Sequence, residues 1–376
     1  MNNTRLLRQD ALDLLRFPLA VVVVIVHTFS YEEIVVSGIQ YKVSEYSIFC
    51  DAHLFVDAFL RRISVPIYFF ISGYVFFAGV KFNFDIYKQK IKNRIKTLLI
   101  PYVIWNAFAV FLIIFKQLPI FESFLSYDGS ALNLSLRSIL NCFWIYDGGL
   151  NPHPVKGLIV GQYEPINISL WYLRDLMAIV VSTPLIYLLV KRFKIYSVYL
   201  FLVVYIISLA FNFPISSIAG GYFYFSWGAY MSIYNIDMMV AFNKYFKLSV
   251  VMYLMCGFTY MALSKTQPVI AEWILIIKAI FALFACFNFA AYLLRNTSLK
   301  VSEFLASSSF FIYVSHWIFV GRLRKVLFMI LKPETGIEIL AIYIYTVVIL
   351  VLALLLLFFL LKRYCPSVLK VLVGRK

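Results

Sequence analysis

The sequence predicts an all-α membrane protein, a polytopic bundle of about ten transmembrane helices. Of the 376 residues, 63% are hydrophobic and only 14% are charged, whereas soluble domains are nearer half apolar and a quarter charged. The apolar residues also occur in runs long enough to cross about 30 Å of hydrocarbon as helices. A soluble globule of this length has too little interior to bury so much apolar surface, so we expect lipid to cover it.

Short polar joints separate the expected helices, as at residues 191–194, 235–237 and 295–297. The first helix has the basic start of a signal peptide, but Asp13 and Arg16 interrupt its apolar run and no small-residue cleavage site follows. We therefore interpret it as a retained helix. The expected helices span residues 12–31, 62–80, 97–116, 168–190, 195–213, 217–235, 247–264, 270–292, 303–321 and 337–361.

Two further segments complete one transmembrane domain that covers residues 1–376. Residues 81–97 are basic and amphipathic, and we expect them to lie along the cytoplasmic surface. Residues 117–167 form the longest outer loop, with one short amphipathic helix expected near residues 134–145. Loops of this length are often functional.

The basic residues predict the orientation of the chain. A net charge of +16 comes without any nucleic-acid-binding motif, so we attribute it to cytoplasmic loops, which are rich in Lys and Arg. With both termini in the cytoplasm, roughly 20 of the 34 Lys and Arg fall inside and about 11 outside. One outer joint opposes this assignment, because it carries Arg322, Arg324, Lys325 and Lys332.

Ionisable residues within apolar helices are costly and each needs a reason. Arg16 and His27 lie eleven residues apart on the first helix, so both project from one face, about 16 Å apart along the axis. Asp13 is spaced to orient Arg16. A ligand with an anionic head and a long thin arm, such as acyl-coenzyme A, would contact both. The alternative is that His27 is a hydrogen-bonded core residue and that Arg16 reaches back to the cytoplasmic interface.

Other polar residues converge at the outer side of this topology. A histidine oriented by a carboxylate or a hydroxyl is suited to act as a general base there. The alternative is that these are interfacial residues, which is our interpretation of Arg61. Lys278 also needs a partner, and the sequence does not identify one. The converging residues are Arg62, Trp171, Arg174, Asp175, Tyr313, Ser315 and His316.

Five motifs occur in a fixed order along the chain. They are Arg16 followed after ten residues by His27; Arg62 with an apolar run to Ser72, Gly73 and Tyr74; Arg94 before Pro101, Tyr102 and Trp105; Leu170, Trp171, Tyr172 and Leu173; and Ser309 through Tyr313 to His316. On the expected helical frame they resemble the acyltransferase-3 family of bacterial membrane acyltransferases. This family includes O-acetyltransferases of lipopolysaccharide and enterobacterial common antigen. Many members carry a second arginine where this chain has Thr97, which weakens the case for donor binding by Arg94.

The resemblance implies transfer of an acetyl or other short acyl group from acyl-coenzyme A to a hydroxyl of a cell-surface glycan or lipid-linked sugar. Acetyl-coenzyme A would be a substrate, with no bound cofactor, no metal and no nucleic acid, in a bacterial cytoplasmic membrane. The oligomeric state stays open. The implied roles are catalytic for His27, Asp175 and His316; donor-binding for Asp13, Arg16 and Arg94; acceptor-binding or oxyanion-stabilising for Arg62, Trp171, Arg174 and Tyr313; and structural for Ser72, Gly73 and Tyr74.

The main alternative function is a transporter or flippase of glycan precursors without acyl transfer. Transporters often contain inverted repeats with paired broken helices, and the sequence shows no such pairing. A sensor or scaffold is a third class, and it would not need two intramembrane histidines on one side. Without the family resemblance, the residues support only a polytopic membrane protein with a polar cluster toward one face.

Overall fold

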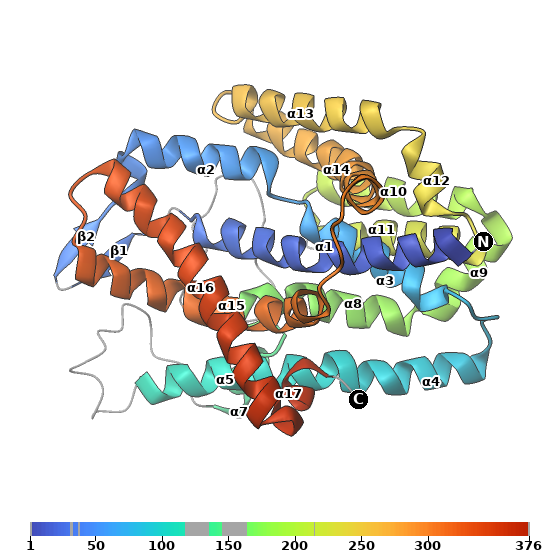
Figure 1. Ribbon diagram of the computed structural model, residues 1–376, viewed down its shortest axis with the longest axis horizontal. Helices are drawn as coiled ribbons and strands as arrows, with labels where there is room; N and C mark the ends of the chain where they lie inside the picture. The colour runs from blue at the N-terminus through green and yellow to red at the C-terminus, as the bar shows by residue number, and fades with distance from the viewer. Residues whose placement is uncertain are drawn as a thin grey trace. The chain divides into compact units, whose positions relative to one another are not determined.

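The computed structural model describes residues 2–30, 33–36, 38–116, 135–144, 164–213 and 215–374. These residues are almost wholly helical, which confirms the predicted all-α class (Figure 1). The described helices group into two compact units. The first unit comprises Met1–Tyr68 and Asn235–Tyr364, and the second comprises Phe69–Tyr234 and Cys365–Lys376.

The first unit is a bundle of long helices around the N-terminal helix. Helix α1 packs mainly on α15 and α14, α15 packs on α16, and α13 packs on α14. Helix α2 contacts α13 and α16. The helices are α1 (Asn2–Thr28), α2 (Ser47–Phe59), α12 (Met238–Asn243), α13 (Phe246–Leu263), α14 (Pro268–Asn296), α15 (Glu303–Leu331) and α16 (Gly336–Tyr364).

A small hairpin follows α1 in the first unit. Strands β1 (Ile34–Val36) and β2 (Ile39–Tyr41) pair antiparallel, with Ile34 opposite Tyr41. A short 3-10 helix, η1 (Val43–Glu45), leads from the hairpin to α2. Apolar side chains of these elements bury one another and fix the C-terminal end of α1 against α15 and α16. The buried cluster consists of Phe29, Ile34, Tyr41, Val43, Phe49, Val56, Phe328, Ile339, Ile342 and Tyr343.

The second unit contains the shorter helices, and its boundary with the first falls within α3. Helix α11 packs on α10 and α8, and α17 packs on α5. Helices α8 and α9 bend by 63° at a break next to Pro184. The helices are α3 (Ser64–Phe77), α4 (Phe84–Arg94), the π-helical turn η2 (Ile95–Leu99), α5 (Ile100–Lys116), α7 (Leu136–Asn141), the 3-10 helix η3 (Ile168–Leu170), α8 (Trp171–Val181), α9 (Thr183–Phe193), α10 (Ile195–Ala210), α11 (Ser216–Ile233) and α17 (Pro366–Val373).

Gly73 and Gly228 allow α3 and α11 to approach closely within the second unit. A Cβ atom on Gly73 would lie 2.0 Å from the carbonyl oxygen of Phe225, and one on Gly228 would lie 2.1 Å from that of Phe70. Neither backbone can retreat without separating the helices. This is the close packing for which the Ser72–Gly73 pair is suited.

Each of the ten predicted segments contains a helix, but the count of about ten spans is not confirmed. Within the described residues, six helices are long and apolar enough to cross a membrane, or seven if the bent α8–α9 pair is one span. Helices α3 and α10 are shorter than a span. Helix α11 has the length, but its Gly, Ser and Tyr residues lower its hydropathy, and most of its residues are buried in the unit.

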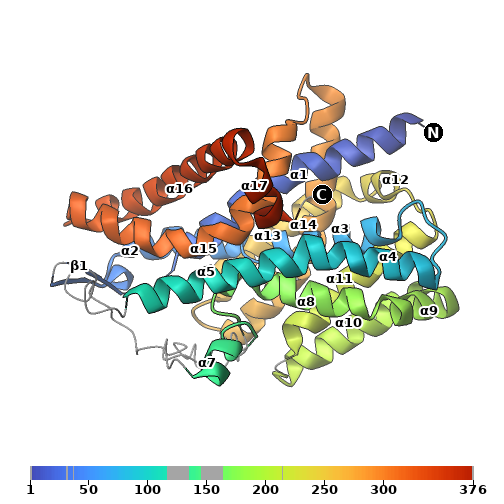
Figure 2. The same cartoon turned by 90° about the horizontal axis from the view of Figure 1, so that it is seen from below.

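The structure also changes several predicted boundaries. Helix α4 continues through η2 into α5 as one continuous helical stretch, Phe84–Phe115, rather than ending as a separate segment near residue 97 (Figure 2). Helix α7 lies within the short helix expected near residues 134–145, whereas most of the 117–167 loop is outside the described residues. Helix α15 extends to Leu331, not to residue 321, so Arg322, Arg324 and Lys325 are helical residues and not loop charges.

Candidate functional site

The two predicted catalytic histidines lie next to each other in the first unit. His27 is in the last turn of α1 and His316 is in the middle of α15, and these two helices pack along each other. Their ring centroids are 5.3 Å apart. Trp317 meets the His27 ring edge-on, with centroids 5.2 Å apart. His316 is fully buried and His27 is half-buried, so His27 is the more accessible of the pair.

A backbone carbonyl fixes the proton on the His316 ring. The Nδ1 atom lies 2.7 Å from the carbonyl oxygen of Tyr313 and 3.2 Å from that of Ile312. A carbonyl oxygen only accepts, so Nδ1 carries the hydrogen and donates it. In the neutral ring the lone pair therefore resides on Nε2, which is buried without a hydrogen-bond partner among the described residues. Such a nitrogen can accept a proton or attack a carbonyl carbon.

A row of aromatic rings leads from the histidine pair toward Arg16. The Tyr313 ring lies 6.3 Å from His316 and 6.4 Å from Tyr68. The Tyr68 hydroxyl donates to the carbonyl oxygen of Arg16, at 2.9 Å. Arg16 is paired with Asp13, as predicted from their spacing, with Nη1 and Oδ1 2.7 Å apart. The Arg16 side chain is 43% exposed, so an anion can reach it.

Arg324 anchors the end of α1 beside His27. Its Nη1 donates to the carbonyl oxygen of Thr28 at 2.8 Å and to the Ser30 hydroxyl at 3.0 Å. The guanidinium also lies 5.1 Å from the centre of the Tyr343 ring. A cation at a helix C-terminus satisfies carbonyls that have no partner within the helix. Because α15 carries both Arg324 and His316, this one helix orients His27 and supplies its neighbour.

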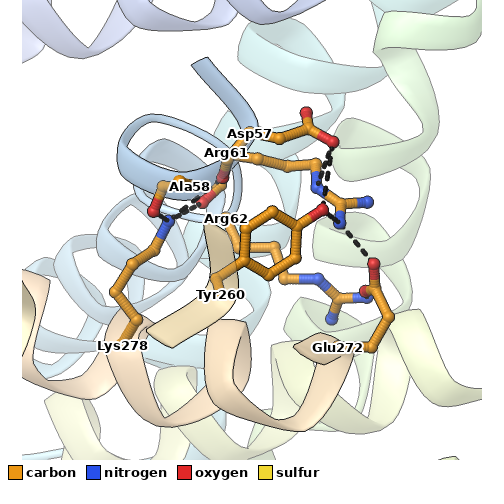
Figure 3. A network of polar contacts seen from close by, with 7 residues as sticks. All are labelled: Asp57, Ala58, Arg61, Arg62, Tyr260, Glu272 and Lys278. Atoms are coloured by element: carbon orange, nitrogen blue, oxygen red, sulfur yellow. Dashed lines mark hydrogen bonds and ion pairs between the residues drawn. The ribbon is translucent and has the colours of Figure 1, made fainter. Parts of the chain in front are cut away.

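Arg62, predicted to bind the acceptor or the oxyanion, lies in an ion-pair network (Figure 3). Its Nη2 lies 3.1 Å from Oε2 of Glu272 on α14. Arg61 is paired with the other Glu272 oxygen and with Asp57, and it donates to the Tyr260 hydroxyl. Arg61 thus contacts side chains of α2, α13 and α14.

Lys278 has the partner that the sequence could not identify. Its Nζ donates to the carbonyl oxygens of Ala58 at 2.7 Å and Arg61 at 2.9 Å, and is 3.4 Å from that of Asp57 (Figure 3). The carbonyls of Asp57 and Ala58 lie in the last turn of α2, and that of Arg61 follows it just before Arg62, whose φ of 61° breaks the helix. Lys278 therefore caps α2 at the break between α2 and α3.

In the second unit, Arg174 and Asp175 form a buried pair. The Arg174 Nε and Nη2 atoms lie 3.0 and 2.9 Å from the same Asp175 oxygen, and the other oxygen accepts from the Ser217 hydroxyl. Asp175, predicted to be catalytic, thus has both oxygens engaged. Trp171 begins α8 and is half-exposed.

The remaining predicted residues also lie in the second unit. Arg94 is the last residue of α4 and is half-buried. The hydroxyl oxygens of Ser72 and Tyr172 lie 3.2 Å apart, and Tyr74 is buried. The predicted set thus divides between the two units, with the histidines, Asp13, Arg16, Arg62 and Tyr313 in the first.

Sequence reasoning did not single out several residues that the structure places at these sites. Glu164 precedes η3. Burial raises the pKa of its carboxyl to about 7; the nearby Arg174 opposes this rise, and Asp175 adds to it. Nothing in the local sequence marks this carboxyl. Tyr68 and Trp317 look like ordinary apolar-run residues. Arg324 had one signal, since it follows His316 by eight residues in an apolar run that the structure shows to be one helix. Among the described residues, no group of His, Cys, Asp and Glu is arranged to hold a metal ion.

A bundle of apolar helices with a histidine pair inside it defines a multi-pass membrane protein with a candidate group-transfer site. The chain belongs to the acyltransferase-3 family, whose model, an acyltransferase domain, matches residues 9–358. The resemblance seen in the motifs is thereby confirmed, and the protein is a membrane acyltransferase.

One curated relative is the succinoglycan biosynthesis protein ExoH of Rhizobium meliloti (strain 1021). It is 27% identical over 334 residues, which cover 86% of this chain and 82% of that protein. No solved structure matches the chain.

Proposed function

We propose that the protein transfers an acetyl or other short acyl group from acyl-coenzyme A to a hydroxyl of a cell-surface glycan or lipid-linked sugar. The observation that carries the proposal is the His27–His316 pair, in which the buried His316 has a fixed tautomer and His27 is accessible. Family membership supports acyl transfer, and a relative named for succinoglycan biosynthesis supports a polysaccharide acceptor.

In the proposed reaction, His27 takes the proton of the acceptor hydroxyl. The hydroxyl oxygen then forms a bond to the thioester carbonyl carbon, and the carbon–sulfur bond breaks. The thiolate of coenzyme A leaves and takes up the proton from His27, so the products are an O-acyl ester and the free thiol. A second route uses the same residue as a nucleophile, which forms an acyl-imidazole before the hydroxyl attacks.

Arg16 is the proposed anchor for the phosphates of the donor. Its guanidinium is accessible, and the fork of an arginine matches phosphate oxygens. The aromatic row of Tyr68 and Tyr313 gives the pantetheine arm an apolar path from Arg16 to the histidines. Arg94 stays a proposed second donor contact. We further propose an inner-membrane location with both termini in the cytoplasm.

The test is release of coenzyme A from acetyl-coenzyme A by purified protein in liposomes, with a crude membrane glycolipid fraction as acceptor. Removal of a general base costs about 100-fold or more, so His27→Ala should lose turnover on that scale. His53→Gln changes a histidine outside the site and should retain it. Near-normal turnover by His27→Ala would sink the assignment.

Absence of coenzyme A release by the wild type would decide between acyl transfer and transport. If it releases no coenzyme A, and acetyl-coenzyme A does not shift its thermal midpoint, the donor does not bind. Transport of glycan precursors then becomes the function to pursue.

A further inference from the structure

Two parts of the predicted outer loop, residues 142–144 and 164–167, are held together in the second unit. The backbone N–H of Ile166 donates to the carbonyl oxygen of Cys142 at 2.8 Å. The N–H of Asn167 donates to the side-chain oxygen of Asn106 on α5, at 3.2 Å. The Tyr102 hydroxyl, also on α5, donates to the carbonyl of Phe143. Residues 142–144 and 164–167 therefore form a fixed neck on α5.

The Trp144 side chain of this neck lies over the buried Arg174–Asp175 pair. The Arg174 guanidinium is 5.6 Å from the centre of the Trp144 ring, and its Nη1 donates to the Trp144 carbonyl oxygen at 3.0 Å. Arg174 is itself 8% exposed and fixed by Asp175, so it supports the indole from beneath. Glu164, also in the neck, lies near enough to interact electrostatically with both Arg174 and Asp175.

Trp144 is 55% exposed, although Arg174 holds its ring and its carbonyl oxygen. A rigid, half-exposed indole beside a carboxyl has the chemistry that recognises a saccharide. The apolar C–H face of a sugar ring packs on an aromatic face, and a few convergent polar groups bind its hydroxyls and set its orientation. A carboxyl with a pKa near neutrality both donates to and accepts from hydroxyls.

We propose that Trp144 and Glu164, supported by Arg174 and Asp175, form a subsite for a sugar ring of the acceptor. This inference rests on the proposed transfer to a glycan and adds the residues that bind that glycan. Trp144 supplies the stacking surface, and Glu164 binds ring hydroxyls. Arg174 and Asp175 act as positioning residues, because their hydrogen bonds are directed at each other, at the neck and at Ser217.

Binding of glycan measures the subsite without acyl transfer. The probe is the fluorescently labelled glycan fraction cleaved from crude membrane glycolipids, titrated against full-length protein in nanodiscs. The same fraction after periodate oxidation, which destroys vicinal diols, should not bind. We expect Trp144→Ala to weaken binding about 10-fold or more, within the range of hot-spot aromatic residues. Trp144→Phe and Glu164→Gln should lose less, because each keeps part of the contact.

Tyr199→Ala is the matched control, since Tyr199 is 54% exposed on α10 of the same unit. It should bind like wild type. In the liposome assay, Trp144→Ala should raise the glycolipid concentration for half-maximal coenzyme A release without changing the KM for acetyl-coenzyme A.

The outcomes separate this inference from the proposed function. If Trp144→Ala binds glycan as tightly as wild type, Trp144 is an interfacial aromatic residue and the subsite is wrong, whatever the result for His27→Ala. If wild type binds no glycan and releases no coenzyme A, the proposed function fails with it.

Discussion

At the scale of single residues, the site depends on how the end of α1 is held. His27 precedes Thr28, whose carbonyl oxygen has no partner in its own helix and accepts from Arg324. Arg324 is only 3% exposed, so its hydrogen bond to Thr28 is charge-assisted and protected from water. Arg324 thereby limits the movement of His27 relative to His316.

Loss of this anchor should reduce catalysis more than binding. A displacement of about 1 Å at a reacting group costs about 100-fold in rate, so Arg324→Gln should lower kcat on that scale with little change in the KM for acetyl-coenzyme A. Millimolar guanidinium should partly restore Arg324→Ala. Both are measured by coenzyme A release.

Arg322→Gln provides the comparison, because Arg322 lies on the same helix and, among the described residues, donates only to the carbonyl oxygen of Ile318, within that helix. It should keep its kcat. Equal losses in Arg322→Gln and Arg324→Gln would mean that charge on α15, and not the anchor, is what matters.

Residues inside apolar runs were the ones that the sequence could identify. Arg16, His27 and His316 stand out because charge or a titratable ring is costly there. Spacing along one helix does not show, however, that Glu272 of another helix pairs with Arg62. Trp144 and Glu164 lie in a loop, where polar and aromatic residues carry no such signal.

At the scale of elements, the break between α2 and α3 is stabilised by one lysine. Ser64, just beyond the break, donates to the carbonyl oxygen of Leu19 on α1, at 2.9 Å. The break thus lies beside the part of α1 between Arg16 and His27. Broken backbone at membrane depth persists only where protein groups satisfy it, and Lys278 satisfies the exposed carbonyls of α2.

Lys278→Met should destabilise the protein by leaving these carbonyls buried without a donor. The expected loss in the free energy of unfolding is about 2–3 kcal/mol, the cost of an unsatisfied buried group. Thermal unfolding in detergent measures it. Lys265→Met, at an exposed lysine after α13, should change the midpoint little. An unchanged midpoint for Lys278→Met would show that water reaches the break.

At the scale of the whole molecule, the predicted orientation rests on the distribution of Lys and Arg. The structure removes part of the one objection to it, since Arg324 is buried and bonded inside a helix. Helix α16 is one of the candidate spans, and it separates the turn that contains Glu334 from Cys365. These two positions should therefore face opposite sides of the membrane.

Labelling with a membrane-impermeant maleimide tests this orientation. The native Cys365 is exposed and should react in inside-out vesicles but not in intact cells, because we place it in the cytoplasm. Cys365→Ser should remove that label. Glu334→Cys in the Cys365→Ser background should show the reverse pattern, and labelling of both positions from one side would contradict a spanning α16.

The sequence alone determined the membrane class and the family, located most of the long helices and singled out the histidines, because apolar runs and costly charges are local features of the chain. The number of spans was not determined in this way, since α3 and α10 are short and the polar α11 is buried by its neighbours. Only the tertiary structure decided that His27 meets His316, that Arg62 pairs with Glu272 and that Arg324 holds α1. Each of these contacts joins residues far apart in the chain, so helix packing chooses the partner that local spacing leaves open.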